Sequence, residues 1–139
     1  LKGYTVSSAD VYISIAGTIG LAGCIPPNLD GANLTENAAK LCRLKSIDKI
    51  FLAYVLNSGI VRPQIISLTG KATQPKLALF RIEKIKLPLP SPSEQKRIVE
   101  IMDGVVKDLE VKHVRKARLV QIKKGLMTDL LTGKRRVRV

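Results

Sequence analysis

The fold of this chain follows from residues 91–133, which read SPSEQKRIVEIMDGVVKDLEVKHVRKARLVQIKKGLMTDLLTG. Ser91 is a good helix N-cap, Pro92 suits the first helical turn, and Glu94 has the spacing of a capping box. No proline follows Pro92, and Gly133 is a natural left-handed stop. The stretch predicts one continuous helix, roughly 60 Å long at 1.5 Å per residue. Since a helix this long exceeds what a small core can cover, we expect it to lie against a partner.

Apolar residues inside this helix recur every seven residues in two overlapping series, which start at Ile98 and Val106. Two stripes make a face that is wider than the seam of a simple two-stranded coiled coil. The middle of the helix is strongly basic. We predict that the helix contacts a partner through Ile98, Ile101, Val105, Leu109, Leu119, Ile122 and Leu126.

The residues before the helix are enough for one small core of mixed α and β structure. Two apolar runs that flank a glycine-rich turn predict paired strands, and Asp48 is a plausible N-cap for a helix that Gly59 ends. Residues 60–76 carry few periodic apolar side chains and many polar ones, which favours an exposed reading surface. The expected elements are strands at 11–15, 19–25 and 85–89 and a helix at 49–57. The segment 38–44 could form either a strand or a helix. The predicted domains are 1–90, the helix 91–133 and a basic tail 134–139.

Charge is distributed unevenly along the chain. The net charge is +13, and residues 70–139 hold eighteen Lys and Arg against seven Asp and Glu, compared with six against four before them. Such an excess attracts phosphate backbones or anionic membranes. Only 4% of the residues are aromatic and Trp is absent, which argues against stacking platforms for single strands and favours double-stranded DNA.

The two cysteines, Cys24 and Cys42, are too few for a disulfide framework and have no metal-site spacing. Reduced thiols in a cytoplasmic protein are the simplest interpretation. The apolar run at 11–25 is too short to span a bilayer, so no membrane partner is expected. Residues 21–24 do match a lipoprotein cleavage box, which leaves a lipid-anchored surface protein as a further alternative.

No constellation of catalytic residues is visible, and neither a cofactor nor a metal is predicted. A single histidine, His113, and the absence of a GxSxG or metal-binding spacing leave few ways to assemble a nucleophile or base. We expect a chain that is not an enzyme.

Several motifs resemble the DNA specificity subunit of type I restriction-modification enzymes. The most specific is Leu-Pro-Leu-Pro at 87–90 followed by Ser-Glu-Gln-Lys-Arg-Ile-Val at 93–99; the others are residues 10–20, 31–39, 70–77 and 125–134. The resemblance implies a target recognition domain that reads one half of a split DNA sequence. It also implies a helix that pairs antiparallel with a second such helix, sets the half-site distance and docks methyltransferase (modification) subunits, and through them the restriction subunit.

The chain departs from the family pattern in two respects. It has one long helix where a full subunit has two, and it is expected to begin midway through a recognition domain. Ser91-Pro92 also replaces the usual Pro-Leu. The helix partner is then either a second copy of the chain, as a homodimer, or the other half of a specificity subunit.

Side-chain chemistry indicates which residues would contact DNA. Lysine and arginine hold phosphates, whereas amides and hydroxyls offer donors and acceptors to base edges. The phosphate contacts are predicted at Arg62, Lys71 and Lys76, and the base contacts at Thr73, Gln74, Asn33 and Asn37. Alternatively, the two asparagines only organise the loop around Thr35. A second alternative for the whole chain is a helical assembly module without DNA binding of its own.

Overall fold

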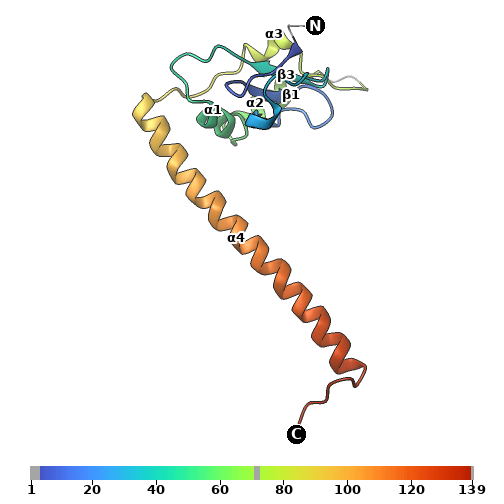
Figure 1. Ribbon diagram of the computed structural model, residues 1–139. Helices are drawn as coiled ribbons and strands as arrows, with labels where there is room; N and C mark the ends of the chain where they lie inside the picture. Colours follow the sequence, from blue (N-terminus) through green and yellow to red (C-terminus); the bar gives the residue numbers. More distant parts are fainter. Residues whose placement is uncertain (1–3, 71–72, 139) are drawn as a thin grey trace. The chain divides into compact units, whose positions relative to one another are not determined.

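The computed structural model describes residues 4–70 and 73–138 (Figure 1). The described residues form two compact units that divide between Val99 and Glu100. The first is a globular unit of mixed α and β structure, and the second is mostly one helix. This agrees with the predicted α+β class.

A three-stranded antiparallel sheet lies in the globular unit. Its strands are β1 (Val11–Ser14), β2 (Ala22–Cys24) and β3 (Ala38–Leu41), in the order β2-β1-β3. The central strand β1 buries Val11 and Ile13 completely while Tyr12 and Ser14 remain half-buried, as the two-residue period of a strand requires. The predicted pair of strands is confirmed, and the ambiguous segment at 38–44 forms a strand.

Helix α1 (Lys49–Leu56) begins where the sequence predicts. The Asp48 carboxylate accepts hydrogen bonds from the backbone N–H groups of Ile50 (2.8 Å) and Phe51 (3.0 Å), as an N-cap should. The helix packs on β1 and β2 and supplies much of the core. It ends at a C-cap on Asn57, so Gly59 is not the residue that stops it.

The segment 60–76, which was predicted to be an exposed reading surface, is partly helical and partly buried. Residues Arg62–Leu68 form helix α2, with Val61 and Ile65 buried at 0% and 2% exposure. These two side chains are four residues apart and so lie on one face of a helix, where they reach the core. Among the described residues after this helix, 73–76 lie outside helices and strands and are exposed. A short turn, η2 (Pro27–Leu29), lies between β2 and β3.

The edge strand predicted at 85–89 is also wrong, because the described structure has no strand there. Helix α3 (Leu79–Ile82) comes before it, and the following chain is irregular. The Gln64 side chain explains the difference. Its amide donates to the Lys86 carbonyl (2.8 Å) and accepts from the Lys86 N–H (3.0 Å), so this backbone is paired without a neighbouring strand.

Helix α4 (Pro92–Leu131) is continuous over 40 residues, as Figure 1 shows. The Ser91 hydroxyl accepts from the Glu94 N–H at 3.3 Å, and Gly133 has a φ of +73° just after the last turn. Both ends therefore agree with the prediction. The first turns of α4 belong to the globular unit, where Gln95 is buried and Ile98 and Val99 pack against the core.

Candidate nucleic-acid interface and helix surface

The two loops predicted to contact DNA meet at the end of β1. Ile15 donates its N–H to the carbonyl of Asn37 (2.8 Å) and accepts from the N–H of Leu77 (2.9 Å). The N–H of Ala16 also points to the Asn37 carbonyl, at 3.3 Å. Ile15, the residue that follows β1, thus holds the loop before β3 and the loop before α3 next to each other.

The described part of the loop between α2 and α3 presents three of the seven predicted contacts. Thr73, Gln74 and Lys76 are exposed, and Leu77 anchors the end of the loop with a fully buried side chain. The N–H of Gly70 approaches the Lys76 carbonyl at 3.5 Å, which closes the loop. Lys71 lies outside the described residues. The structure therefore gathers three predicted residues on one exposed loop.

The two asparagines lie in the loop that leads into β3. Asn33 forms an isolated antiparallel bridge with Thr5, and its neighbour Leu34 donates to the Tyr4 carbonyl at 2.7 Å. The side chains of Asn33 and Asn37 are exposed. The backbones of both asparagines thus take part in hydrogen bonds or bridges of the globular unit, while the residues themselves remain exposed.

Arg62 lies apart from these loops along the chain. It is the first residue of α2, and the loop with Gln74 follows the opposite end of that helix. Seven residues of helix correspond to a separation of roughly 10 Å along the axis. The structure leaves Arg62 exposed but does not place it in the same loop as the other predicted contacts.

A cationic and aromatic cluster on α3 and the turn that follows it was not predicted from the sequence. The Arg81 guanidinium carbon and the Lys84 ammonium each lie 5.7 Å from the centre of the Phe80 ring, which is 58% exposed. Arg81 also donates to the Leu68 carbonyl at 2.6 Å, so it ties α3 to the end of α2. The signal in the sequence was an aromatic residue followed by a cation one and four positions later.

Asp30 and Cys24 have shifted pKa values with clear causes. A hydrogen bond from the Ser8 N–H to the Asp30 carboxylate lowers the pKa of that exposed group. Burial raises the pKa of the Cys24 thiol, which donates to the Lys49 carbonyl at 3.5 Å. Cys24 lies in β2, opposite Val11, so the cysteine of the lipoprotein-like box is part of the sheet.

The second unit presents an apolar surface along α4. Of the predicted interface residues, Ile98 is half-buried against the globular core, and the others are 47% to 57% exposed. A shallow groove lined mainly by apolar side chains runs over the last turns. Exposed large apolar residues of α4 include Ile101, Val105, Leu109, Leu119, Val120, Ile122, Leu126, Met127, Leu130 and Leu131.

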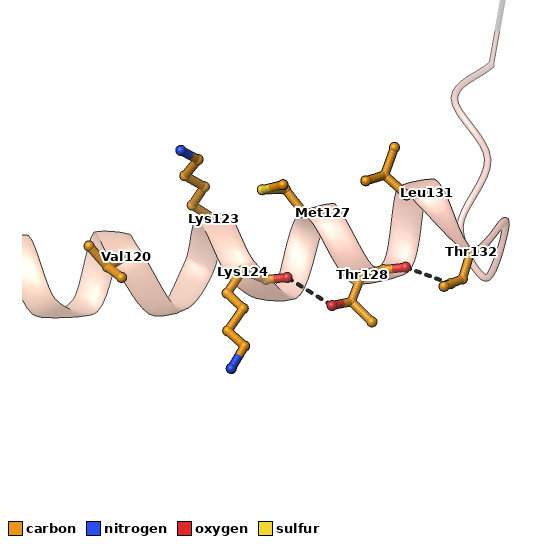
Figure 2. A pocket seen from close by; sticks show the side chains of 7 residues that line it. All are labelled: Val120, Lys123, Lys124, Met127, Thr128, Leu131 and Thr132. Atoms are coloured by element: carbon orange, nitrogen blue, oxygen red, sulfur yellow. Dashed lines mark hydrogen bonds between the residues drawn. The ribbon is translucent and has the colours of Figure 1, made fainter.

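Figure 2 shows the end of this surface at close range. Lys123, Met127 and Leu131 project from one side of the helix, and Lys124 and Thr128 project from the other. The Thr128 hydroxyl donates to the Lys124 carbonyl (3.0 Å), so its polar atom is turned back onto the helix backbone. The apolar side chains therefore remain open to contact.

Charged groups on α4 pair locally. Lys112 contacts Asp108 at 2.7 Å, although both side chains are well exposed. Past the helix, Arg135 lies 3.3 Å from the Asp129 carboxylate and donates its N–H to the Asp129 carbonyl at 2.9 Å. The first part of the basic tail is thus held against the last helical turns.

The described residues contain no group of three or more His, Cys, Asp or Glu side chains that could share a metal ion. Within the same part of the chain, no helix is both long enough and apolar enough to cross a membrane. What the structure does present is a polar loop surface on a small globular unit and a long helix with an uncovered apolar face.

The chain belongs to the family described as the type I restriction modification DNA specificity domain, whose model matches residues 1–121. This is a family of specificity components and not of catalytic subunits. The resemblance identified from the sequence is therefore confirmed.

Two relatives from Methanocaldococcus jannaschii are similar to this chain. One, provisionally named as the specificity subunit of the type I restriction enzyme MjaX, is 31% identical over 137 residues, or 96% of this chain and 30% of its own length. The specificity subunit of the type I restriction enzyme MjaVIII is 35% identical over 94 residues, or 68% of this chain and 22% of its own length.

A solved structure shares the fold. The crystal structure of the HsdS subunit from Thermoanaerobacter tengcongensis superposes with a TM-score of 0.67 and 22% identity, over 88% of this chain and 32% of that one. The chain thus spans less than a third of the curated relatives and about a third of this solved subunit.

Proposed function

We propose that this chain reads one half of a split double-stranded DNA target with its globular unit and holds a second reading unit at a fixed distance through α4. In this proposal residues 1–90 read DNA, residues 91–133 form the spacer and pairing helix, and residues 134–139 are a basic tail. The chain acts in the cytoplasm. The observation that carries the proposal is the exposed apolar surface of α4, which a 40-residue helix in water would not maintain without a partner.

The partner of α4 in this proposal is an antiparallel helix, from a second copy of the chain or from the other half of a specificity subunit. The paired helices also dock methyltransferase subunits, which carry the base-flipping chemistry and recruit the restriction subunit. The names of the relatives support this assignment, since both are specificity subunits of restriction enzymes.

The globular unit would contact DNA through the adjoining loops at Ile15. Lys76 and Arg62, with Lys71, hold phosphates and fix the register. Gln74 and Thr73 reach base edges in the major groove. Asn33 and Asn37 extend this surface from the neighbouring loop. The exposure of Thr73, Gln74 and Lys76 and of the two asparagines, together with the backbone contacts of both loops to Ile15, supports the arrangement.

Duplex binding by purified chain tests the proposal. After the target is found by selection from random duplexes, binding should weaken steeply with salt, at about 0.9 log units per phosphate contact for each log unit of salt. Gln74→Ala should relax preference at one base position, at a cost of about 1–3 kcal/mol. Lys76→Ala should weaken binding to all duplexes alike and lower the salt slope by about 1.

Gln121→Ala is the matched control, because Gln121 is an exposed glutamine of α4 and belongs to neither loop. It should leave duplex binding unchanged. If duplexes bind weakly and Gln74→Ala has no effect on preference, the chain is instead an assembly module without DNA binding of its own.

A further inference from the structure

Gln95 is an unusual residue for its position in the chain. It lies in the first turn of α4, and it is the single buried residue among the described residues of that helix, with 1% exposure. Its neighbours Glu94 and Lys96 are exposed. A polar side chain is rarely buried so completely unless its hydrogen bonds are satisfied.

The Gln95 amide makes three hydrogen bonds to backbone groups of the globular unit. Its oxygen accepts from the N–H of Asp48 at 2.7 Å. Its nitrogen donates to the carbonyls of Ser46 and Pro90, both at 2.9 Å. These partners come from the loop that caps α1 and from the proline segment that precedes α4. One side chain therefore joins the beginnings of two helices.

The loop that Gln95 contacts has an unusual backbone. Ser46 has a φ of +59°, which is uncommon for a residue other than glycine. Its carbonyl is aimed at the Gln95 amide, and Asp48 two residues later caps α1 through its side chain. The loop is thus shaped to receive this amide, whereas a plain packing contact would need no such shape.

Ile98 and Val99 extend the attachment by one further turn, since both pack against the core. Because hydrogen bonds are directional, the three bonds of the Gln95 amide are satisfied in only one orientation of the first turn of α4. The apolar contacts of Ile98 and Val99 stabilise the turn that follows. Apolar packing alone would tolerate small rotations more readily.

We propose that Gln95 is a positioning residue that clamps the start of α4 to the globular unit, so that the helix holds DNA-reading units at one separation. The role in DNA spacing rests on the function proposed above. The clamp itself does not, and it can be measured without DNA.

Distance measurement by pulsed electron spin resonance tests the clamp in the full chain. One spin label is placed on the exposed Cys42 and the other on Lys107→Cys of α4, with Cys24→Ser to remove the second native thiol. The labelled chain is diluted with unlabelled chain, so that only distances within one copy are seen. The doubly labelled chain that retains Gln95 should give a narrow distribution of distances between the two labels.

Gln95→Met should broaden that distribution clearly, because methionine has similar length but makes none of the three hydrogen bonds. Gln121→Met, the matched change on an exposed face of the same helix, should leave it narrow. An unchanged width in Gln95→Met, or a broad distribution before any change at residue 95, would overturn the clamp. Circular dichroism reports whether each variant is folded.

A second variant covers the case in which Gln95→Met does not fold. Gln95→Glu keeps an acceptor for the Asp48 N–H but loses the amide NH₂ group that donates to both the Ser46 and Pro90 carbonyls. It should broaden the distribution as well, and a width equal to that of the unaltered chain would overturn the proposal.

The spacing role is tested with the selected duplexes, prepared with half-sites one base pair closer or farther apart. The unaltered chain should prefer one spacing, and the Gln95 variants should reduce that preference about tenfold, which corresponds to about 1.4 kcal/mol. Equal preference in variant and unaltered chain would overturn the spacing role. Absence of any duplex binding would overturn the proposed function and the spacing role together, while the spin-label result would still decide the clamp.

Discussion

At the scale of single residues, a comparison of two glycines in the turn between β1 and β2 distinguishes the cost of backbone strain from the cost of overpacking. Gly17 and Gly20 have similar left-handed φ values, +70° and +84°. A Cβ on Gly17 would meet nothing within 4 Å, whereas a Cβ on Gly20 would lie 2.8 Å from the Ile65 Cγ2. The turn therefore needs glycine for its conformation at both positions, and for space only at the second.

We predict that Gly17→Ala lowers the free energy of unfolding by about 1 kcal/mol, the cost of a left-handed alanine. Gly20→Ala should lower it by about 2–4 kcal/mol, because strain is joined by overpacking against α2. Urea unfolding followed by circular dichroism measures both. Equal losses for the two variants would show that Ile65 moves aside at no cost.

Residue-level features were predictable where their cause is local. Asp48 was identified as an N-cap because its partners lie two and three residues ahead. Gln95 was not singled out, since its burial depends on a loop almost fifty residues earlier in the chain. The same holds for the candidate DNA surface: exposure of Gln74 could be expected from a polar loop, but its closeness to the Asn37 loop through Ile15 could not.

At the scale of elements, the sequence predicted α4 best. Its cap, its length without proline and its terminal glycine are all signals within the helix itself. The segment at 85–89 failed for the opposite reason. Its alternating pattern is typical of a strand, but a strand needs a neighbour, and the Gln64 amide takes the Lys86 backbone groups instead. Helix α2 was missed because its apolar face is only a few residues long.

The exposed apolar face of α4 predicts that two copies of the chain associate, and the strength of that association can be measured. Ile122 is 56% exposed and lies in the middle of the second apolar block. Ile122→Gln should raise the dissociation constant of a pair of chains about tenfold or more, since each copy loses about 1.5–3 kcal/mol of burial. Sedimentation equilibrium measures this constant. Gln121→Ala, one residue away and off the apolar series, should leave it unchanged, and an equal constant for Ile122→Gln would exclude that residue from the interface.

At the scale of the whole molecule, the apolar residues of α4 form two blocks separated by a basic middle. The first block contains Ile101 and Val105, and the second contains Ile122 and Leu126. An antiparallel pair of helices lays the first block of one copy on the second block of the other, so that Val105 faces Ile122 and Ile101 faces Leu126. A parallel pair would instead place each residue beside its own counterpart, so that Val105 faces Val105 and Ile122 faces Ile122.

Disulfide cross-linking of two α4 helices tests the central claim most directly. In a chain with Cys24→Ala and Cys42→Ser, the double variant Val105→Cys with Ile122→Cys should form a covalent dimer on mild oxidation, seen on a non-reducing gel. The single variants Val105→Cys and Ile122→Cys should remain uncross-linked. Cross-linking of each single variant with itself would show a parallel pair, and no dimer from any variant, with α4 still helical, would contradict pairing between two copies of this chain.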